Sequence, residues 1–332
     1  MNAPPGPDSA PDEPHAELTR QIRDWITEQI FAAQLEDVVA DDLVREMPSE
    51  PRRFSDLVPP YRGSPPWLLS LVMPELSGGR ITEKQLAVIG EHPGALALTI
   101  SGLNQANFEK LITGYGRQFL AIDFFKCPRI ADLTPLEDLP DLRLAAFFWN
   151  QRATRLWDLS RSRALTGLRF EGFNRLHDLA DLRAGTELRE LDFSGARWGT
   201  SFFESLEPLA ALSDLRSLSF GATRINDGRI EPLGGLTKLE ELAIPTNMFT
   251  TRQLAWLRAR LPDSVKSRSL APIEQLKDPV EDDRGNPLDV MLIGKHKPFL
   301  NSVKNQARIR KHADEFWQMV DAFRSDPALK PD

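Results

Sequence analysis

A single cysteine, Cys127, occurs in the 332-residue sequence, so no disulfide bond can form within the chain. Folds stapled by disulfides, typical of small secreted domains, are therefore excluded. Long apolar runs are missing as well: the longest, Trp67 to Met73, is far shorter than the roughly 20 residues of a membrane-spanning helix. Residues 1–14 lack the basic and apolar stretches of a secretory signal. These absences predict a cytoplasmic protein without a membrane partner, although an effector exported without a cleaved signal would show the same pattern.

Positive charge is not in excess. Lysine and arginine number 41 against 48 aspartates and glutamates, which gives a net charge of -7 and an isoelectric point near 5.4. Affinity for nucleic acid depends on neutralising phosphates, so this balance argues against a nucleic-acid partner. The five histidines are scattered without metal-ligand spacing, and the segment LIGKHKP around Lys295 lacks the remaining residues of a phosphate-binding loop. The sequence therefore predicts no metal, no cofactor and no catalytic activity.

What the chain does contain is one short phrase that returns seven times, with apolar residues at its first, fourth and sixth positions. Successive copies start 24, 23, 23, 23, 27 and 24 residues apart, as their first residues show. The copies are Ala95/Leu98/Ile100, Phe119/Ile122/Phe124, Leu142/Ala145/Phe147, Leu165/Leu168/Phe170, Leu188/Leu191/Phe193, Leu215/Leu218/Phe220 and Leu239/Leu242/Ile244. A fixed period of this length is the sequence mark of a solenoid.

The repeated phrase predicts how the coils pack. One coil cannot bury its three apolar residues alone, so consecutive coils must stack, and their strands then form a parallel sheet on a concave face. Apolar residues spaced by three, from Ile130 through Leu133 and Leu136 to Leu139, predict 3₁₀ turns on the convex side.

The phrase LTGLRFEGF, which begins at Leu165, resembles the LxxLxLxxN/C pattern of leucine-rich repeat proteins, closest to the short-repeat, internalin-like class. In three copies the ninth position holds Cys127, Asn150 or Asn247, the residue types whose side chains bond to loop backbone in that family. The resemblance implies an α/β leucine-rich repeat solenoid. The resemblance is highly specific for the fold and says almost nothing about function. The repeat array together with the missing catalytic constellation favours a protein-binding scaffold over an enzyme.

Bacterial ubiquitin ligases that contain leucine-rich repeats carry a nucleophilic cysteine in a large domain after the array. This chain has no cysteine after Cys127, and Cys127 occupies a repeat position, so the resemblance does not extend to that activity.

Four segments are predicted. Residues 1–14 form a leader too poor in apolar groups to fold, and residues 15–78 form a helical region followed by a proline-rich wrap. Residues 79–276 form the repeat array, and residues 277–332 form a small strand and helix module that docks on the last repeats.

An apolar stripe at helical spacing marks the first predicted helix, and a second helix is predicted over residues 33–45. The stripe consists of Leu18, Ile22, Trp25, Ile26 and Ile30. The two helices form either a cap on the repeat array or an independent interaction module.

Two similar helices are predicted at the ends of the array. ITEKQLAVI from Ile81 and FTTRQLAWL from Phe249 share threonine at the second place, a good N-cap, and Gln-Leu-Ala at the fifth to seventh. Val265 to Leu270 is a weak eighth copy of the phrase. Past the array, residues 277–287 are predicted to be a polar linker, Asp289 to Ile293 a strand and Asn305 to Arg324 an amphipathic helix.

The variable positions of the phrase point outward on the concave face and supply the candidates for partner binding. These are Phe125, Phe148, Trp149, Asp123, Arg143, Arg169, Glu171, Arg189 and Asp192. The aromatic half of this set is either a binding hot spot or a seat for the chain's own amino-terminal helices. The charged half either pairs opposite charges on neighbouring strands or forms a polar docking surface.

The 27-residue repeat carries an insertion whose aromatic residues are a second candidate surface, or else fold back over the convex side. They are Trp198, Phe202 and Phe203.

The leading functional hypothesis is a protein-binding scaffold whose contact centres on Phe125 and Phe148. A bacterial effector or a toxin-neutralising protein is an alternative of the same class. Two others concern the tail: an enzyme using Asp289, Lys295, His296 and Lys297, or a basic cluster from Lys295 to Lys311 that meets an acidic partner or nucleic acid.

Overall fold

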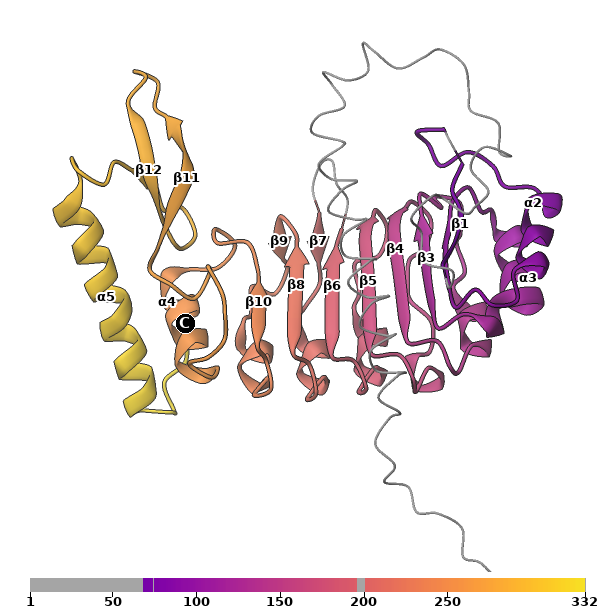
Figure 1. The fold of residues 1–332 in the computed structure, drawn as a ribbon. Coiled ribbons are helices and arrows are strands. Elements are labelled where there is room, and N and C mark those ends of the chain that lie inside the picture. Colours follow the sequence, from indigo (N-terminus) through magenta and orange to yellow (C-terminus); the bar gives the residue numbers. More distant parts are fainter. Residues whose placement is uncertain (1–67, 74, 196–200, 332) are drawn as a thin grey trace, which may run out of the picture.

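The computed structural model describes residues 68–73, 75–195 and 201–331 (Figure 1). The predicted leader, the two predicted amino-terminal helices and Trp198 lie outside these residues.

An eight-stranded, entirely parallel sheet runs along the array in the order β1-β2-β3-β4-β5-β6-β8-β10 (Figure 1). Equivalent phrase positions pair across it, as in Leu98 with Ile122 and Ile122 with Ala145. The strands are β1 (Leu68–Leu71), β2 (Ala97–Ile100), β3 (Ala121–Phe125), β4 (Leu144–Asn150), β5 (Gly167–Phe173), β6 (Glu190–Ser194), β8 (Ser217–Gly221) and β10 (Glu241–Ala243). The predicted leucine-rich repeat solenoid is therefore confirmed, with one strand, β1, ahead of the seven predicted copies.

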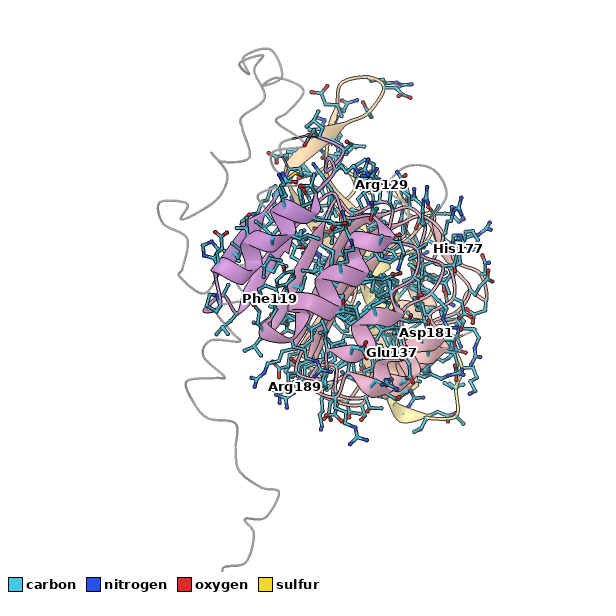
Figure 2. The ribbon with its side chains drawn as sticks, turned by 90° about the vertical axis from the view of Figure 1, so that its right-hand side faces the viewer. Phe119, Arg129, Glu137, His177, Asp181 and Arg189 are labelled. Atoms are coloured by element: carbon cyan, nitrogen blue, oxygen red, sulfur yellow. The ribbon has the colours of Figure 1, made fainter. Side chains whose placement is uncertain are left out.

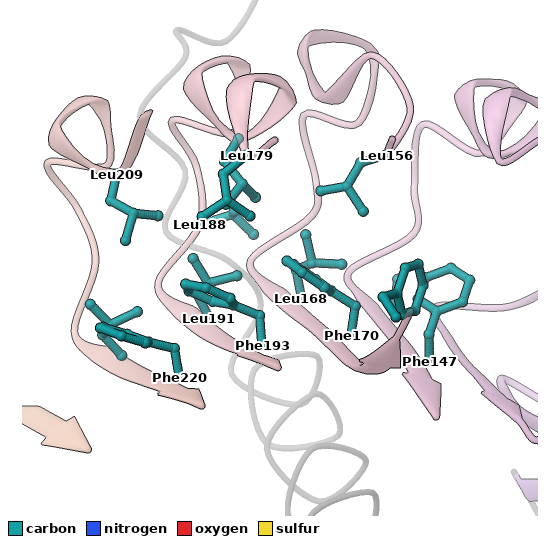
Figure 3. Close-up of a cluster of buried hydrophobic side chains, with 14 of the residues drawn as sticks. Phe147, Leu156, Leu168, Phe170, Leu179, Leu188, Leu191, Phe193, Leu209 and Phe220 are labelled. Atoms are coloured by element: carbon teal, nitrogen blue, oxygen red, sulfur yellow. The ribbon is translucent and has the colours of Figure 1, made fainter. Parts of the chain in front are cut away.

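The core lies between this sheet and the turns on its far side (Figure 3). Its centre is a file of phenylalanine rings contributed by the sixth phrase position. Phe124 stacks on Phe147 at 4.7 Å between ring centroids, Phe170 on Phe193 at 5.4 Å, and Phe193 on Phe220 at 5.2 Å. Each coil thus buries its ring against the next, which is why the array folds only as a stack.

Short 3₁₀ turns form the convex side, as the three-residue spacing of leucines predicts. They are η4 (Thr134–Asp138), η5 (Leu159–Arg161), η6 (Ala180–Ala184), η7 (Glu207–Ala211) and η8 (Glu231–Gly235). One coil departs from this pattern, because α3 (Gln105–Tyr115) between β2 and β3 is an α-helix that the sequence reading missed. Its signal was present: Asn104 caps the helix, and Phe108, Leu111 and Ile112 are buried at helical spacing.

Both predicted end helices form, and both begin with the same capping box. Thr82 and Gln85 cap α2 (Glu83–Ala87), which continues as the 3₁₀ helix η2 (Val88–Glu91). Thr250 and Gln253 cap α4 (Thr251–Arg260). In each, the threonine side chain accepts from the glutamine backbone while the glutamine side chain reaches back to the threonine N–H.

The ninth phrase position stabilises the turn in two of the three copies that carry Asn or Cys. The side-chain amide of Asn150 donates to the carbonyl of Ile130, and its oxygen accepts from the N–H groups of Arg152 and Ala153, each at 2.9 Å. The buried thiol of Cys127 lies 3.5 Å from the carbonyl of Ile100. Asn247 is exposed, so the role expected for its side chain inside the turn is not observed.

Replacing Asn150 by alanine is expected to lower the free energy of unfolding by about 2 kcal/mol, because three backbone groups, two of them buried, lose their partner. Urea denaturation measures the change. Asn247→Ala is the matched control at the equivalent, exposed position and should cost less than about 0.5 kcal/mol. Equal effects of the two substitutions would contradict this account of the turn.

A second, antiparallel sheet follows the array and consists of β11 (Ile273–Glu281), β12 (Pro287–Leu292) and β13 (Phe299–Leu300). The linker predicted over residues 277–287 is therefore wrong: its first half belongs to β11, and only residues 282–286 turn. The polar sequence of β11 does not indicate a strand. The strand forms because β12 pairs with it and supplies its backbone hydrogen bonds. Gly285, at φ 74°, lies in the turn itself.

The last helix, α5 (Gln306–Ser325), packs beside α4. Phe316, Val320 and Phe323 on its buried face belong to the same apolar core as the repeats. The carboxyl-terminal module therefore closes the end of the solenoid.

Candidate binding surface on the concave face

The fifth phrase position forms one row of outward-pointing side chains across the sheet, because the strands pair in register. In sheet order the row reads Thr99, Asp123, Ala146, Arg169, Asp192, Ser219 and Ala243. Its burial changes along the solenoid. Thr99, Asp123 and Ala146 are only 8%, 2% and 3% exposed, whereas Arg169, Asp192 and Ser219 are half-buried and Ala243 is exposed. The concave face thus divides into a buried part over β2 to β4 and an open part over β5 to β10.

Two predicted aromatic residues meet at the carboxyl ends of β3 and β4. The rings of Phe125 and Phe148 stack with centroids 5.3 Å apart and an interplanar angle of 14°. The Lys126 ammonium lies 4.9 Å from the centre of the Phe125 ring, in cation–π geometry. Phe125 is half-buried and Phe148 is buried. Phe125 and Phe148 are called the aromatic pair below, and Trp149 directly follows Phe148 in the chain.

The residue after each ring has a left-handed backbone. Lys126 has φ 51° and Trp149 has φ 62°, while Gly102 and Gly172 at the equivalent places of the neighbouring coils have φ 72° and 71°. Glycine adopts this conformation without cost, but a lysine or a tryptophan there is strained by roughly 1 kcal/mol. Lys126 was not among the predicted site residues. Its alignment with Gly102 and Gly172 in the repeat was the signal that could have found it.

Asp123 is a buried carboxyl group on the concave face. Its Oδ1 atom has no hydrogen-bond partner among the described residues, nor has Oγ1 of Thr99 beside it in the row. Burial raises the pKa of Asp123 from 3.8 to about 7, against the opposing effect of the Arg169 guanidinium. Both oxygens are buried and keep an unused acceptor position.

The charged half of the predicted set is held together by Arg169. Its guanidinium lies 2.9 Å from the Glu171 carboxylate and 3.3 Å from that of Asp192. Burial raises the pKa of Asp192, an effect that Arg169 opposes and Glu171 reinforces. Arg169 thus pairs with Glu171 on its own strand, β5, and with Asp192 on the neighbouring strand, β6, where the pairing of opposite charges was predicted.

Arg143 and Arg189 lie apart from the aromatic pair. Each directly precedes its strand, β4 or β6, whereas Phe125, Phe148 and Trp149 lie at the carboxyl ends of strands. Arg189 is exposed and Arg143 half-buried. Figure 2 shows Arg189 on one side of the coil and His177 on the other.

The insertion places Phe202 beside His177 and Phe203 in the core. The rings of Phe202 and His177 stack at 4.1 Å with an interplanar angle of 4°, and Phe203 is wholly buried against Phe193. These residues form β7 (Phe202–Phe203), which pairs with β9 (Arg224–Ile225). Phe203 therefore belongs to the core, because its ring fills the space beside the phenylalanine file. Only Phe202 of the two is partly accessible.

The polar residues of the tail that were considered for catalysis are not gathered in one place: Asp289 lies in β12, and Lys295, His296 and Lys297 lie between β12 and β13. Lys295, His296 and Lys297 are exposed, and the Asp289 carboxylate accepts hydrogen bonds from the N–H and hydroxyl of Ser302 at 2.7 and 2.6 Å. These bonds lower the pKa of Asp289. Within residues 68–73, 75–195 and 201–331, no three His, Cys, Asp or Glu side chains are grouped so that they could hold a metal ion. No helix in the same ranges is long and apolar enough to cross a bilayer.

No protein-family model and no curated protein matches the sequence. Similar solved structures include internalin C2 of Listeria monocytogenes, with 18% identity, coverage of 56% of this chain and 73% of that one, and a TM-score of 0.34. The leucine-rich repeat domain of the type III effector XopL has 14% identity, coverage of 78% and 96%, and a TM-score of 0.33. TLR13, in a complex with an ssRNA, has 17% identity and a TM-score of 0.34; the match covers 60% of this chain and only 25% of that one.

Proposed function

We propose that this chain is a non-enzymatic, cytoplasmic scaffold that holds a protein partner against the concave face of its leucine-rich repeat solenoid. Solenoids in general present an extended concave surface for binding, and stacked coils make that surface rigid. The single free cysteine, buried in the core, suits a reducing compartment.

The observation that carries the proposal is the pair of strained residues beside the stacked rings. Lys126 and Trp149 have the same left-handed backbone as Gly102 and Gly172 of the neighbouring coils, so the fold is less stable than it would be with glycine there. Strain of this kind concentrates at functional sites, and here one of the two strained residues, Lys126, sets its ammonium over the Phe125 ring. Tryptophan and other aromatic residues are enriched among the residues that dominate binding energies.

The surroundings of the aromatic pair indicate what the partner presents. Phe125 and Phe148 offer apolar contact, and the buried oxygens of Asp123 and Thr99 have unused acceptor positions. The ion pairs of Arg169 border this area. A partner segment with apolar side chains and at least one N–H or ammonium donor is therefore complementary to it.

Replacing both Phe125 and Phe148 by alanine is expected to weaken partner binding about a hundredfold, since two central aromatic contacts are lost. The partner is first captured from native lysate with the full-length chain, and its affinity is then measured by calorimetry with purified components. Phe299→Ala, which removes an exposed ring from the carboxyl-terminal sheet, is the control. A folded double variant with unchanged affinity would show that the partner binds elsewhere.

A further inference from the structure

One stretch of the carboxyl-terminal module concentrates positive charge. The chain as a whole has a net charge of -7, yet no aspartate or glutamate occurs between Val290 and Ala313. The same stretch holds six lysines and arginines, all of them exposed: Lys295, Lys297, Lys304, Arg308, Arg310 and Lys311. It includes the end of β12, all of β13 and the first turns of α5, at the end of the solenoid (Figure 1). The function proposed for the concave face does not use these cations.

Packing brings the start and the end of this stretch together. Ile309 on α5 packs against an apolar cluster from β12 and β13, which consists of Val290, Leu292 and Leu300. Burial lowers the pKa of His312 on α5, and the charge of Lys297, in the turn between the two strands, lowers it further. Arg308 lies one helical turn before His312, on the same side of α5. The surface made by Lys297, Lys304, Arg308 and Lys311 is called the basic patch below.

The central cations of the basic patch are unpaired within the described part of the chain. Between neighbouring coils of the array, exposed cations pair with acidic residues, as Arg155 does with Asp181 at 2.9 Å. Among the described residues, Lys297 and Arg308 have no such ion pair and no side-chain hydrogen bond. Their charges are therefore open to an anionic group of another molecule, and the guanidinium of Arg308 can hold a carboxylate by two hydrogen bonds.

Acidic residues of the same module limit the size of the basic patch. Lys304 donates to the side chain of Asn286 at 3.2 Å. Hydrogen bonds from Asn286 lower the pKa of Asp282, and the nearby Lys304 lowers it further. Farther along α5, Lys311 pairs with Glu315 at 3.8 Å. A long polyanion such as nucleic acid would extend from the patch onto these like charges, whereas a short acidic segment would not.

An exposed valine adjoins the basic patch. Val303 is 83% exposed and directly precedes Lys304. The turn that presents it is fixed, because the N–H groups of Val303 and Lys304 donate to Oδ1 of Asn301 at 3.1 and 2.9 Å. Asn301 is held in turn by a hydrogen bond from its Nδ2 to the carbonyl of Pro287. A preorganised turn loses little conformational entropy on binding, and an apolar side chain of a ligand would bury Val303.

We infer that the basic patch, with Val303, docks a short acidic segment of a protein in which aspartates or glutamates flank at least one apolar residue. The carboxylates of the segment pair with Lys297 and Arg308, and its apolar side chain covers Val303. This surface belongs to the carboxyl-terminal module rather than to the concave face, so the inference goes beyond the proposed function and does not depend on it.

Binding of a synthetic peptide to the full-length chain tests the inference. The probe is a fluorescein-labelled peptide of sequence GSDEEVLEDDSG, and its affinity is measured by fluorescence anisotropy in about 50 mM NaCl, where surface charges are weakly screened. Lys297→Glu with Arg308→Glu reverses the centre of the basic patch. Lys277→Glu with Arg284→Glu makes the same change in net charge at two exposed positions of the β11–β12 hairpin and is the matched control. Circular dichroism checks that all variants fold.

Reversing the centre of the patch is expected to weaken binding of the probe at least about tenfold, because two attractions become two repulsions. The control pair should change the affinity less than about threefold. Val303→Ser should weaken binding about fivefold, since buried methyl groups are lost. The same substitution should have no effect on a second peptide, GSDEESSEDDSG, which has no apolar side chain to cover position 303.

Three outcomes would overturn the inference. The probe fails to bind, or binds equally well when Lys297 and Arg308 are reversed; the control pair weakens binding as much as that reversal does; or a single-stranded DNA of about 20 nucleotides binds more tightly than the probe and loses its affinity in the reversed variant, which would make the patch a phosphate-binding surface. The variant with alanine at positions 125 and 148 should bind the probe normally. Failure of this inference therefore leaves the proposed function of the concave face untouched.

Discussion

Replacing Asp123 by asparagine is expected to raise the free energy of unfolding by about 4 kcal/mol at pH 8. Burial raises the pKa of Asp123 from 3.8 to about 7, and each unit of difference between folded and unfolded pKa corresponds to about 1.4 kcal/mol. Asparagine has nearly the same shape and never ionises. The variant therefore avoids the cost of holding a carboxylate inside the protein.

The sign of the pH dependence follows from the raised pKa. Below about pH 4 the carboxyl group is protonated in both states and costs nothing. Between about pH 4 and 7 the unfolded chain releases the proton while the folded chain keeps it, so stability falls as the pH rises. Above about pH 7 the full cost remains. Asp123→Asn should remove this slope.

Urea denaturation at several pH values from 4 to 8 measures both quantities. Asp138, an exposed carboxylate on the convex side, provides the control, and Asp138→Asn should change stability by less than about 0.5 kcal/mol. Should Asp123→Asn destabilise the protein at pH 8, the carboxylate must have a donor that satisfies it. A stabilised variant that also binds its partner less tightly would show that Asp123 trades stability for recognition.

Replacing Phe170 by alanine is expected to lower the free energy of unfolding by about 3–5 kcal/mol. The ring is fully buried, stacks on Phe193 at 5.4 Å and meets Phe173 edge to face at 5.5 Å. Its loss leaves a cavity in the middle of the phenylalanine file, between coils that depend on one another for burial.

The change is measured from the urea midpoint, with the slope of the transition reporting whether the array still unfolds as one unit. Phe299→Ala removes an equally large ring that is 41% exposed and should cost less than about 1 kcal/mol. A loss below about 1 kcal/mol for Phe170→Ala would mean that neighbouring coils collapse to fill the space.

The repeated phrase predicted the architecture because it encodes burial directly. Residues such as Leu168 and Phe170 are apolar at the places where a strand faces its neighbouring coil, and seven copies establish the period. The capping boxes of α2 and α4 were readable for the same reason, since Thr82 and Thr250 bond within one turn of the chain.

Strands β1 and β11 were not predicted, because each forms by pairing with a strand elsewhere in the chain. Strand β11 is polar and forms by pairing with β12. Strand β1 precedes the first complete copy of the phrase and is defined by pairing with β2. Both depend on a partner strand that local sequence does not reveal.

The sequence by itself determined the solenoid, its parallel sheet and the list of side chains that point outward, because periodic burial is a local property of the chain. Only the tertiary structure decided how those side chains differ. It paired Arg169 with Glu171 and Asp192, stacked Phe125 on Phe148, placed Phe203 in the core, and buried Asp123 without a hydrogen-bond partner among the described residues. Burial, pairing and pKa depend on residues from other coils, and their distances exist only once the coils are stacked.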